Sequence, residues 1–272
     1  MDLNTITSVA RPRQRAAIGP VAPGDAFLAG GTWLFSEPQP AVRRLIDLAA
    51  LGWEPLAASD AGLAIAATCP VATLDAFEPP AAWIAAPLIG LCCRSFLASF
   101  KIWNTATVGG NLCMALPAGP MISLAAALDG VCTVWTPDGG ERRVSVVDFV
   151  QGPQQPALAP GEVLRAIDLP RAALTRRFAF RRISLTPLGR SGALLIGTLG
   201  PGFALTVTAS TRRPVQLRFD AVPDAAALAA RLAEAIPDAL YYDDIHGRPD
   251  WRRHMTVTFA EEIRRELAGE TP

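Results

Sequence analysis

The chain has 272 residues, of which half are apolar and 18% are charged, and its formal net charge is zero. This length allows two or three subdomains with a sizeable core, because a chain near this size buries roughly 75% of its extended surface. Nucleic acids and anionic membranes are excluded as main partners, since binding to either requires an excess of basic residues.

Residues 1–55 are expected to form a first subdomain. The apolar run from Asp25 to Ala29 ends in a Gly-Gly pair, which is typical of a buried strand that enters a turn. The apolar run from Leu45 to Leu48 predicts a second strand in the same subdomain.

Residues 56–175 are expected to form a second subdomain that mixes strands and helices. Short apolar runs predict strands at 63–67 and 163–169, and a hairpin of 131–135 with 142–146. Apolar residues at helical spacing predict a helix over 82–100, interrupted at Pro87, and another over 121–128. A further helix is expected to start near Pro70, and the glycine-rich stretch from Thr105 to Asn111 is expected to be a loop.

Residues 176–272 are expected to form a C-terminal α+β domain. Strand patterns at 193–196, 204–209 and 215–219 come first. Helical patterns follow at 225–235 and 252–267, and Asp224 is a suitable N-cap for the first of these helices. The whole chain is therefore predicted to be α+β, in three parts.

Two glycine-rich stretches are candidates for binding a phosphate group. The first is Leu28-Ala29-Gly30-Gly31-Thr32, and the second is Thr107-Val108-Gly109-Gly110-Asn111. Glycines let a backbone approach phosphate oxygens closely and turn several N–H groups toward one anion. The Thr32 hydroxyl and the Asn111 amide add further donors. Such a site needs no lysine, which suits a chain whose only lysine is Lys101.

Neither stretch matches a familiar nucleotide-binding fingerprint. The chain contains no G-x-G-x-x-G and no G-x-x-x-x-G-K-[ST] sequence, so that NAD in a Rossmann domain and ATP on a P-loop are poorly supported. A single Gly-Gly pair is more often an ordinary turn than a ligand site. Two pairs in similar surroundings, each after an apolar run and before a hydrogen-bonding side chain, favour a binding role.

The surroundings of both stretches resemble a known family of flavoproteins. The run from Ile102 to Leu112, with Pro117-Ala118-Gly119 and 124–129 after it, is similar to the second FAD motif of the molybdenum hydroxylase flavoproteins. These proteins are the medium subunits of enzymes like xanthine dehydrogenase and carbon monoxide dehydrogenase. Residues 28–32 resemble their first FAD motif, A-G-G-T, and 149–152 with 158–170 resemble the segments that close their FAD domain. Residues 243–254 resemble a segment of their C-terminal domain.

The resemblance implies a fold and a ligand set. The fold would be a two-subdomain FAD-binding domain of the vanillyl-alcohol oxidase (PCMH) type, followed by a C-terminal α+β domain. FAD would be bound non-covalently, with its diphosphate between the two glycine-rich stretches. The implied cofactor-binding residues are Leu28, Ala29, Gly30, Gly31, Thr32, Trp33, Thr107, Gly109, Gly110, Asn111 and Leu164. No catalytic residue is identified, and Trp33 fits equally well as a flavin or adenine contact and as a hydrophobic plug.

The resemblance also implies that the chain works within a heterotrimeric enzyme. A small [2Fe–2S] subunit would pass electrons from a large molybdopterin subunit to FAD, and FAD would pass them to NAD⁺, oxygen or another acceptor. The five cysteines of this chain lack the C-x₄-C-x₂-C spacing of a [2Fe–2S] site, so both metal cofactors are expected only on partner subunits. The first ten residues show no signal-peptide pattern, and no apolar run is long enough to span a bilayer, which predicts a cytoplasmic protein.

Two departures from the family pattern leave alternatives open. Where the family usually has A-S-P-x-x-D, the chain has the run from Ala115 to Pro120. Leu116 thus replaces a hydroxyl, and Pro120 replaces an acid that is expected near the FAD ribose. These replacements keep open a flavin-free assembly subunit. The other alternative is a self-contained flavoprotein oxidase or dehydrogenase, which would need a base beside the flavin.

Overall fold

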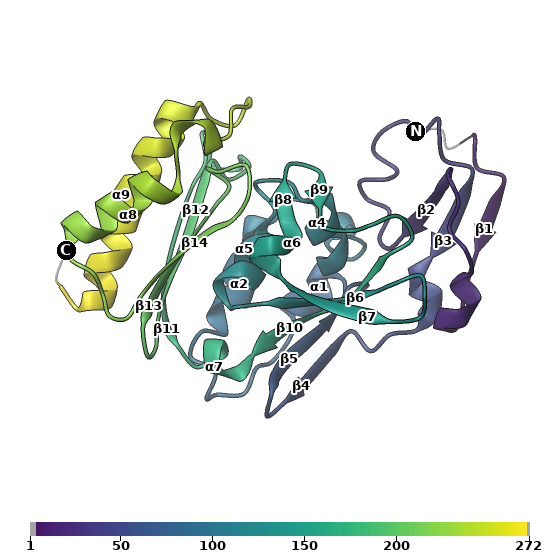
Figure 1. Cartoon of the computed structure of the whole chain (residues 1–272), viewed down its shortest axis with the longest axis horizontal. Helices are drawn as coiled ribbons and strands as arrows, with labels where there is room; N and C mark the ends of the chain where they lie inside the picture. Colours follow the sequence, from purple (N-terminus) through teal and green to yellow (C-terminus); the bar gives the residue numbers. More distant parts are fainter. Residues whose placement is uncertain (1–3, 271–272) are drawn as a thin grey trace.

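The computed structural model describes residues 4–270, and its sheets follow one another in sequence order (Figure 1). The N-terminal sheet has three parallel strands in the order β1-β3-β2. These strands are β1 (Ser8–Ala10), β2 (Asp25–Leu28) and β3 (Arg44–Asp47), and the 3-10 helices η1 (Arg15–Ile18) and η2 (Leu48–Leu51) accompany them. The predicted strands β2 and β3 are confirmed. The sequence did not predict β1, because its three residues are too few and too exposed to show a pattern.

The second sheet has five antiparallel strands in the order β4-β5-β10-β6-β7. Its strands are β4 (Leu56–Ser59), β5 (Gly62–Ala66), β6 (Val131–Trp135), β7 (Glu141–Ser145) and β10 (Val163–Pro170), and a small ribbon pairs β8 (Val150–Gly152) with β9 (Gln155–Pro156). The predicted hairpin is confirmed as β6 and β7. The edge strand β4 was not predicted, since most of its residues face solvent.

Short helices surround the second sheet. They are α1 (Val71–Asp75), α2 (Pro87–Ser95), α3 (Phe100–Trp103), α4 (Val108–Met114), α5 (Pro120–Ala127), α6 (Val146–Phe149) and α7 (Arg171–Leu174). Every residue of α5 is buried, which explains why this helix is apolar on all sides. The prediction of a helix over 82–100 with an interruption at Pro87 is confirmed only for Pro87–Ser95. Pro87 begins α2 instead, because a proline lacks only an N–H that the first turn leaves unpaired.

The third sheet belongs to the C-terminal part and is antiparallel, in the order β11-β12-β13-β14. Its strands are β11 (Arg177–Ile183), β12 (Ala193–Leu199), β13 (Phe203–Thr208) and β14 (Val215–Phe219), followed by α8 (Ala225–Ala235), η3 (Asp238–Leu240) and α9 (Pro249–Ala268). The Asp224 side chain accepts a hydrogen bond from the Ala227 N–H at 2.8 Å, which confirms the predicted N-cap. The apolar runs predicted β12 to β14, whereas arginines interrupt the run of β11.

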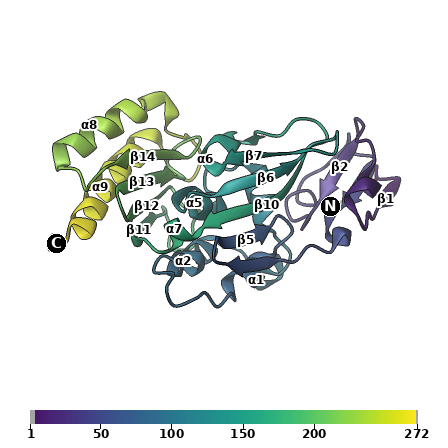
Figure 2. The ribbon, with the colours of Figure 1, turned by 60° about the horizontal axis from the view of Figure 1, so that its bottom comes forward.

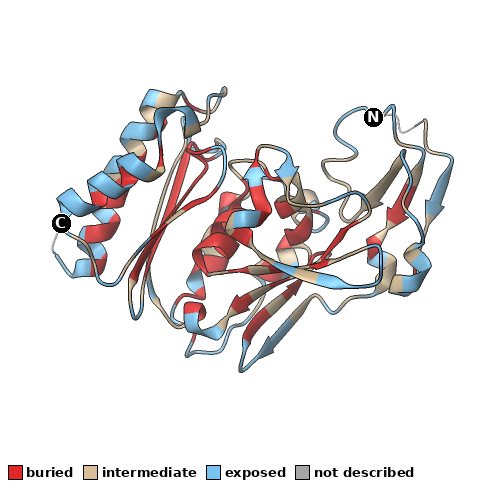
Figure 3. Cartoon of the chain, viewed as in Figure 1, coloured by how far each residue is buried: buried red, intermediate tan, exposed pale blue. Residues whose placement is uncertain are grey.

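The C-terminal sheet lies between two helical layers. Helices α8 and α9 cover its outer face, and α5 packs against its inner face (Figure 1). Buried residues are concentrated along α5 and the strands on either side of it (Figure 3). The Ser123 hydroxyl of α5 is hydrogen-bonded to the Thr208 hydroxyl of β13 at 2.7 Å. Helix α5 therefore joins the core of the second part to that of the third.

The N-terminal sheet and the C-terminal part lie at opposite ends of the molecule, with the five-stranded sheet between them (Figures 1 and 2). Across residues 4–270, none of the helices combines the length and the apolar character that a membrane crossing requires. The same residues contain no group of three or more His, Cys, Asp or Glu side chains that could hold a metal ion.

Candidate functional site

A cavity of about 510 Å³ lies where the three parts of the chain meet. Its wall combines the loop after β2, the segment that follows α2, helix α4, the turn before α5, the start of β10, and two residues of the C-terminal part, Arg190 and Ser191. A cavity of this size and of mainly apolar character is typical of sites for cofactors and other small molecules.

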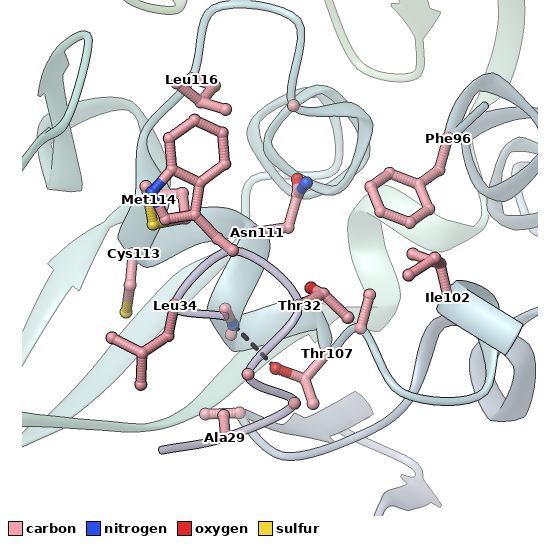
Figure 4. A pocket seen from close by; sticks show the side chains of 18 of the residues that line it. Ala29, Thr32, Leu34, Phe96, Ile102, Thr107, Asn111, Cys113, Met114 and Leu116 are labelled. Carbon is pink, nitrogen blue, oxygen red and sulfur yellow. Dashed lines mark hydrogen bonds between the residues drawn. The ribbon is translucent and has the colours of Figure 1, made fainter. Parts of the chain in front are cut away.

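The structure brings the predicted ligand residues together at this cavity. All of them except Leu28 line it, namely Ala29, Gly30, Gly31, Thr32, Trp33, Thr107, Gly109, Gly110, Asn111 and Leu164. Leu28 is the last residue of β2 and is not part of the cavity wall. Two stretches almost 80 residues apart in the sequence thus share one site (Figure 4).

The first glycine-rich stretch is a tight loop directly after β2. A Cβ atom on Gly30 would lie 1.9 Å from the Thr105 carbonyl oxygen, so the loop backbone packs against the residues just before the second stretch in a way that only glycine permits. Gly31 has a φ of +71°, in the left-handed region. Among residues 4–270, no hydrogen bond uses the N–H groups of Gly30, Gly31 and Thr32. These three adjacent donors are available to an anionic ligand.

The second stretch differs from the predicted loop, because Val108 begins helix α4 and the glycines lie in its first turn. Thr107 is the N-cap, and its hydroxyl accepts a hydrogen bond from the Gly110 N–H at 3.0 Å (Figure 4). The Val108 and Gly109 N–H groups donate to the carbonyl oxygens of Cys69 and Ala67, each at 2.9 Å. These N–H groups of the second stretch are therefore paired within the protein, and only the first stretch keeps unpaired N–H groups that an anion could accept.

Gly109 has a packing role that the sequence did not reveal. A Cβ atom at this position would lie 2.4 Å from the Ala67 Cβ and 2.5 Å from the Ala67 carbonyl oxygen. The glycine lets α4 contact the end of β5 directly, which fixes the helix beside the first loop. The motif alone could not show this, since the contacting residue lies about 40 positions earlier in the chain.

Asn111 connects α4 to the next helix. Its side-chain oxygen accepts a hydrogen bond from the Met121 N–H, in the first turn of α5, at 3.1 Å. The neighbouring residues Leu116 and Pro120, which depart from the family pattern, both line the cavity. Leu116 makes this wall apolar. Pro120 is the first residue of α5, a position at which an N–H group would have no partner within the helix.

Few ionisable side chains reach the cavity wall. Glu162 lines it, but its carboxylate is held by the Arg142 guanidinium at 2.8 and 2.6 Å and by the Ala159 N–H at 2.8 Å. The hydrogen bonds from Arg142 hold the pKa of Glu162 below its ordinary value. Burial raises the pKa of the Cys113 thiol to about 12, so it is not a thiolate nucleophile near neutral pH.

Arg190 is the remaining charged residue of the wall. Among the described residues that line the cavity, none is a histidine, aspartate, lysine or tyrosine. The cavity thus offers hydrogen-bond donors and apolar surface, but no group placed to act as a general base. Sequence reasoning missed Arg190, Ser191 and the apolar wall at 96–98, because no motif links these residues to either glycine-rich stretch.

Comparison with known proteins agrees with this arrangement. Residues 11–172, more than half of the chain, match the model of a family described as the FAD binding domain in molybdopterin dehydrogenase. A comparison with curated protein sequences gave no significant match.

Solved structures with the same fold cover nearly the whole chain. A chain of quinoline 2-oxidoreductase from Pseudomonas putida 86 is 20% identical with a TM-score of 0.79, and 99% of each chain is covered. A chain of carbon monoxide dehydrogenase from Hydrogenophaga pseudoflava is 18% identical with a TM-score of 0.77, covering 95% of this chain and 96% of that one. Reconstituted CO dehydrogenase from Oligotropha carboxidovorans is 19% identical with a TM-score of 0.78, and 97% of each chain is covered. With the family match, these similarities show that the protein belongs to the family of FAD-binding domains of molybdopterin dehydrogenases.

Proposed function

We propose that this chain is the FAD-binding electron-transfer subunit of a molybdenum hydroxylase, and that it holds FAD non-covalently in the cavity described above. A small [2Fe–2S] subunit would reduce the flavin with electrons from a large molybdopterin subunit. The flavin would then pass them to NAD⁺, oxygen or another acceptor. The three subunits would form a cytoplasmic heterotrimer, and this chain would contribute neither the molybdenum nor the iron–sulfur cofactor.

The chemistry of the cavity wall fits FAD. The adjacent N–H groups of Gly30, Gly31 and Thr32 suit a diphosphate, because successive backbone donors stabilise negative charge without a lysine. The apolar residues of the wall, among them Phe96, Ile102 and Leu164, suit the flat rings of the cofactor. When bound, FAD supplies the capacity to accept and release electrons, while the residues of this chain bind it and shield it from water.

The observation that carries the proposal is the absence of a base in the described cavity wall. Oxidation of an organic substrate by a flavin requires a group that takes up the substrate proton. The Glu162 carboxylate is engaged by Arg142, and burial keeps the Cys113 thiol protonated by raising its pKa to about 12. This wall favours electron transfer over the alternative of a self-contained oxidase.

The proposal is tested by asking which donors reduce the FAD-loaded chain. We expect a reduced [2Fe–2S] protein to bleach the flavin absorption under anaerobic conditions. Quinoline and other small organic compounds should leave the absorption unchanged when the chain is alone. Rapid bleaching by NADH would identify NAD⁺ as the acceptor, because electron transfer between the two is reversible. Bleaching of the isolated chain by an organic compound would contradict the proposal and support the self-contained oxidase.

A further inference from the structure

Arg190 is the one charged side chain of the described cavity wall whose charge is not balanced within the protein. The other charged residue of the wall, Glu162, is paired with Arg142. Arg190 makes no hydrogen bond or ion pair with any residue from 4 to 270. Arg190 therefore supplies the one charge of the described wall that no neighbouring side chain balances, and that charge comes from the C-terminal part of the chain.

The backbone on both sides of Arg190 is held in place by two other arginines. Arg182 donates hydrogen bonds to the Gly189 carbonyl oxygen, before Arg190, at 2.6 Å and to the Ser191 side-chain hydroxyl, after it, at 2.7 Å. The buried Arg252 donates to the Gly192 carbonyl oxygen, also after Arg190, at 3.0 Å. A residue between two fixed neighbours loses less freedom when it contacts a ligand, so the backbone of Arg190 is preorganised at the cavity.

The position of Arg190 is also fixed relative to the turn before α5. Arg252 donates to the carbonyl oxygens of both Gly192 and Ala209, and the Ala209 N–H donates to the Pro117 carbonyl oxygen at 2.9 Å. Leu116 and Ala118 flank Pro117 and line the cavity. The C-terminal part thus places its arginine beside this turn, on an element separate from the first glycine-rich loop.

FAD has two places where negative charge resides. The diphosphate is permanently anionic, and the isoalloxazine ring system gains negative charge when the flavin is reduced. The first loop already provides three free N–H groups for the diphosphate. The cationic side chain of Arg190, on a different element with its backbone held in place, is then left for the charge that appears on reduction, because a cation beside the ring system stabilises the charged form selectively.

We propose that Arg190 lies beside the isoalloxazine of bound FAD and stabilises the reduced, anionic form, which raises the midpoint potential of the flavin. This inference rests on the proposed function, since it assumes that FAD occupies the cavity. It assigns to the C-terminal part of the chain a direct influence on the redox properties of the cofactor. Arg182 and Arg252 hold the residues on either side of Arg190, and neither of them is part of the cavity wall.

The test is the midpoint potential of FAD bound to the full-length chain, measured by equilibration with a reference dye. For Arg190→Gln, we expect the preference for reduced over oxidised FAD to fall about tenfold. A tenfold change corresponds to about 30 mV for a two-electron couple. Arg190→Lys keeps the charge and should restore most of the potential. Arg213→Gln removes an exposed arginine of the same part that does not line the cavity, and it should leave the potential unchanged.

The affinities for oxidised FAD and for ADP distinguish this inference from the alternative that Arg190 binds the diphosphate. If Arg190 contacts the isoalloxazine, Arg190→Gln should bind ADP as tightly as the unmodified chain does. An Arg190→Gln chain with an unchanged potential but weaker binding of both FAD and ADP would place the arginine at the diphosphate and overturn the inference. An unmodified chain that binds no FAD would overturn the proposed function as well, so that the two failures are distinguishable.

Discussion

Gly30 is the residue on which the geometry of the cavity depends most directly. Its missing side chain lets the first loop contact the backbone at Thr105, and this contact holds the loop beside α4. The N–H groups that we assign to the diphosphate belong to Gly30 and the two residues that follow it. A change at this position should therefore affect ligand binding and packing together.

For Gly30→Ala, we expect a loss of FAD affinity of at least tenfold and a free energy of unfolding lower by about 1–3 kcal/mol. The added Cβ would lie 1.9 Å from the Thr105 oxygen, so the two stretches must separate. Gly90→Ala is the control, because its Cβ would meet only the flexible end of Arg94. Titration with FAD and urea unfolding measure both effects. A Gly30→Ala variant that binds FAD as tightly as the unmodified chain would contradict the assignment of the first loop.

The N-terminal sheet carries the first loop, so the stability of this sheet decides whether the loop stays in place. Asp25 begins β2, and Arg44 begins the neighbouring strand β3. The Arg44 Nε donates to the Asp25 carboxylate at 2.9 Å, and the Ala22 N–H donates to it at 2.7 Å. The hydrogen bonds from Arg44 lower the pKa of Asp25 from its ordinary value of 3.8 to about 2.

This lowered pKa predicts a pH dependence. The folded chain binds the Asp25 proton less readily than the unfolded chain does, so the stabilisation is fully present above about pH 4 and is lost as the pH falls toward about 2. We expect Asp25→Asn to lower the free energy of unfolding at pH 7. Urea unfolding at several pH values should show this difference shrinking below about pH 4. Asp220→Asn, which removes an exposed carboxylate outside the ion pairs, is the control; a difference for Asp25→Asn that is constant with pH would contradict the account.

Local patterns were sufficient to predict most of the elements that build the site. The apolar runs of β3, β5 and β10 and the apolar helix α5 are visible in the sequence because these elements are largely buried, and the short run of the half-buried β2 is visible as well. The short exposed strands β1 and β4 carry no such signal. The helix at Val108–Met114 was taken for a loop because glycines are poor helix formers, and the contact with Ala67 explains why Gly109 is present there.

The candidate site was predictable where a motif marks it and not elsewhere. Both glycine-rich stretches stood out locally, and the family resemblance indicated that they share one ligand. The sequence could not show that the N–H groups of the second stretch are paired with Cys69 and Ala67. It also could not place Arg190 at the cavity, since that placement depends on long-range hydrogen bonds of Arg252 across the C-terminal part.

At the scale of the whole molecule, the cavity exists because the three parts of the chain, each with its own sheet, converge on it. The N-terminal sheet supplies the loop with free N–H groups, the second part supplies α4 and the apolar wall, and the C-terminal part supplies Arg190. Helix α5 links the second and third parts through their cores. Such a molecule can hold a cofactor rigidly, and in the proposed function the substrate chemistry would take place on another subunit.

The central claim is that this chain binds FAD without a covalent bond, and the visible absorption spectrum of the purified protein tests it most directly. The spectrum is recorded before and after acid treatment, and the supernatant is analysed for flavin. We predict flavin bands in the native protein and intact FAD in the supernatant, with no flavin left on the precipitated chain. A colourless protein that also fails to take up added FAD would contradict the claim and favour a flavin-free assembly subunit. Leu116→Ser and Pro120→Asp would then be the first substitutions to test for a gain of FAD binding.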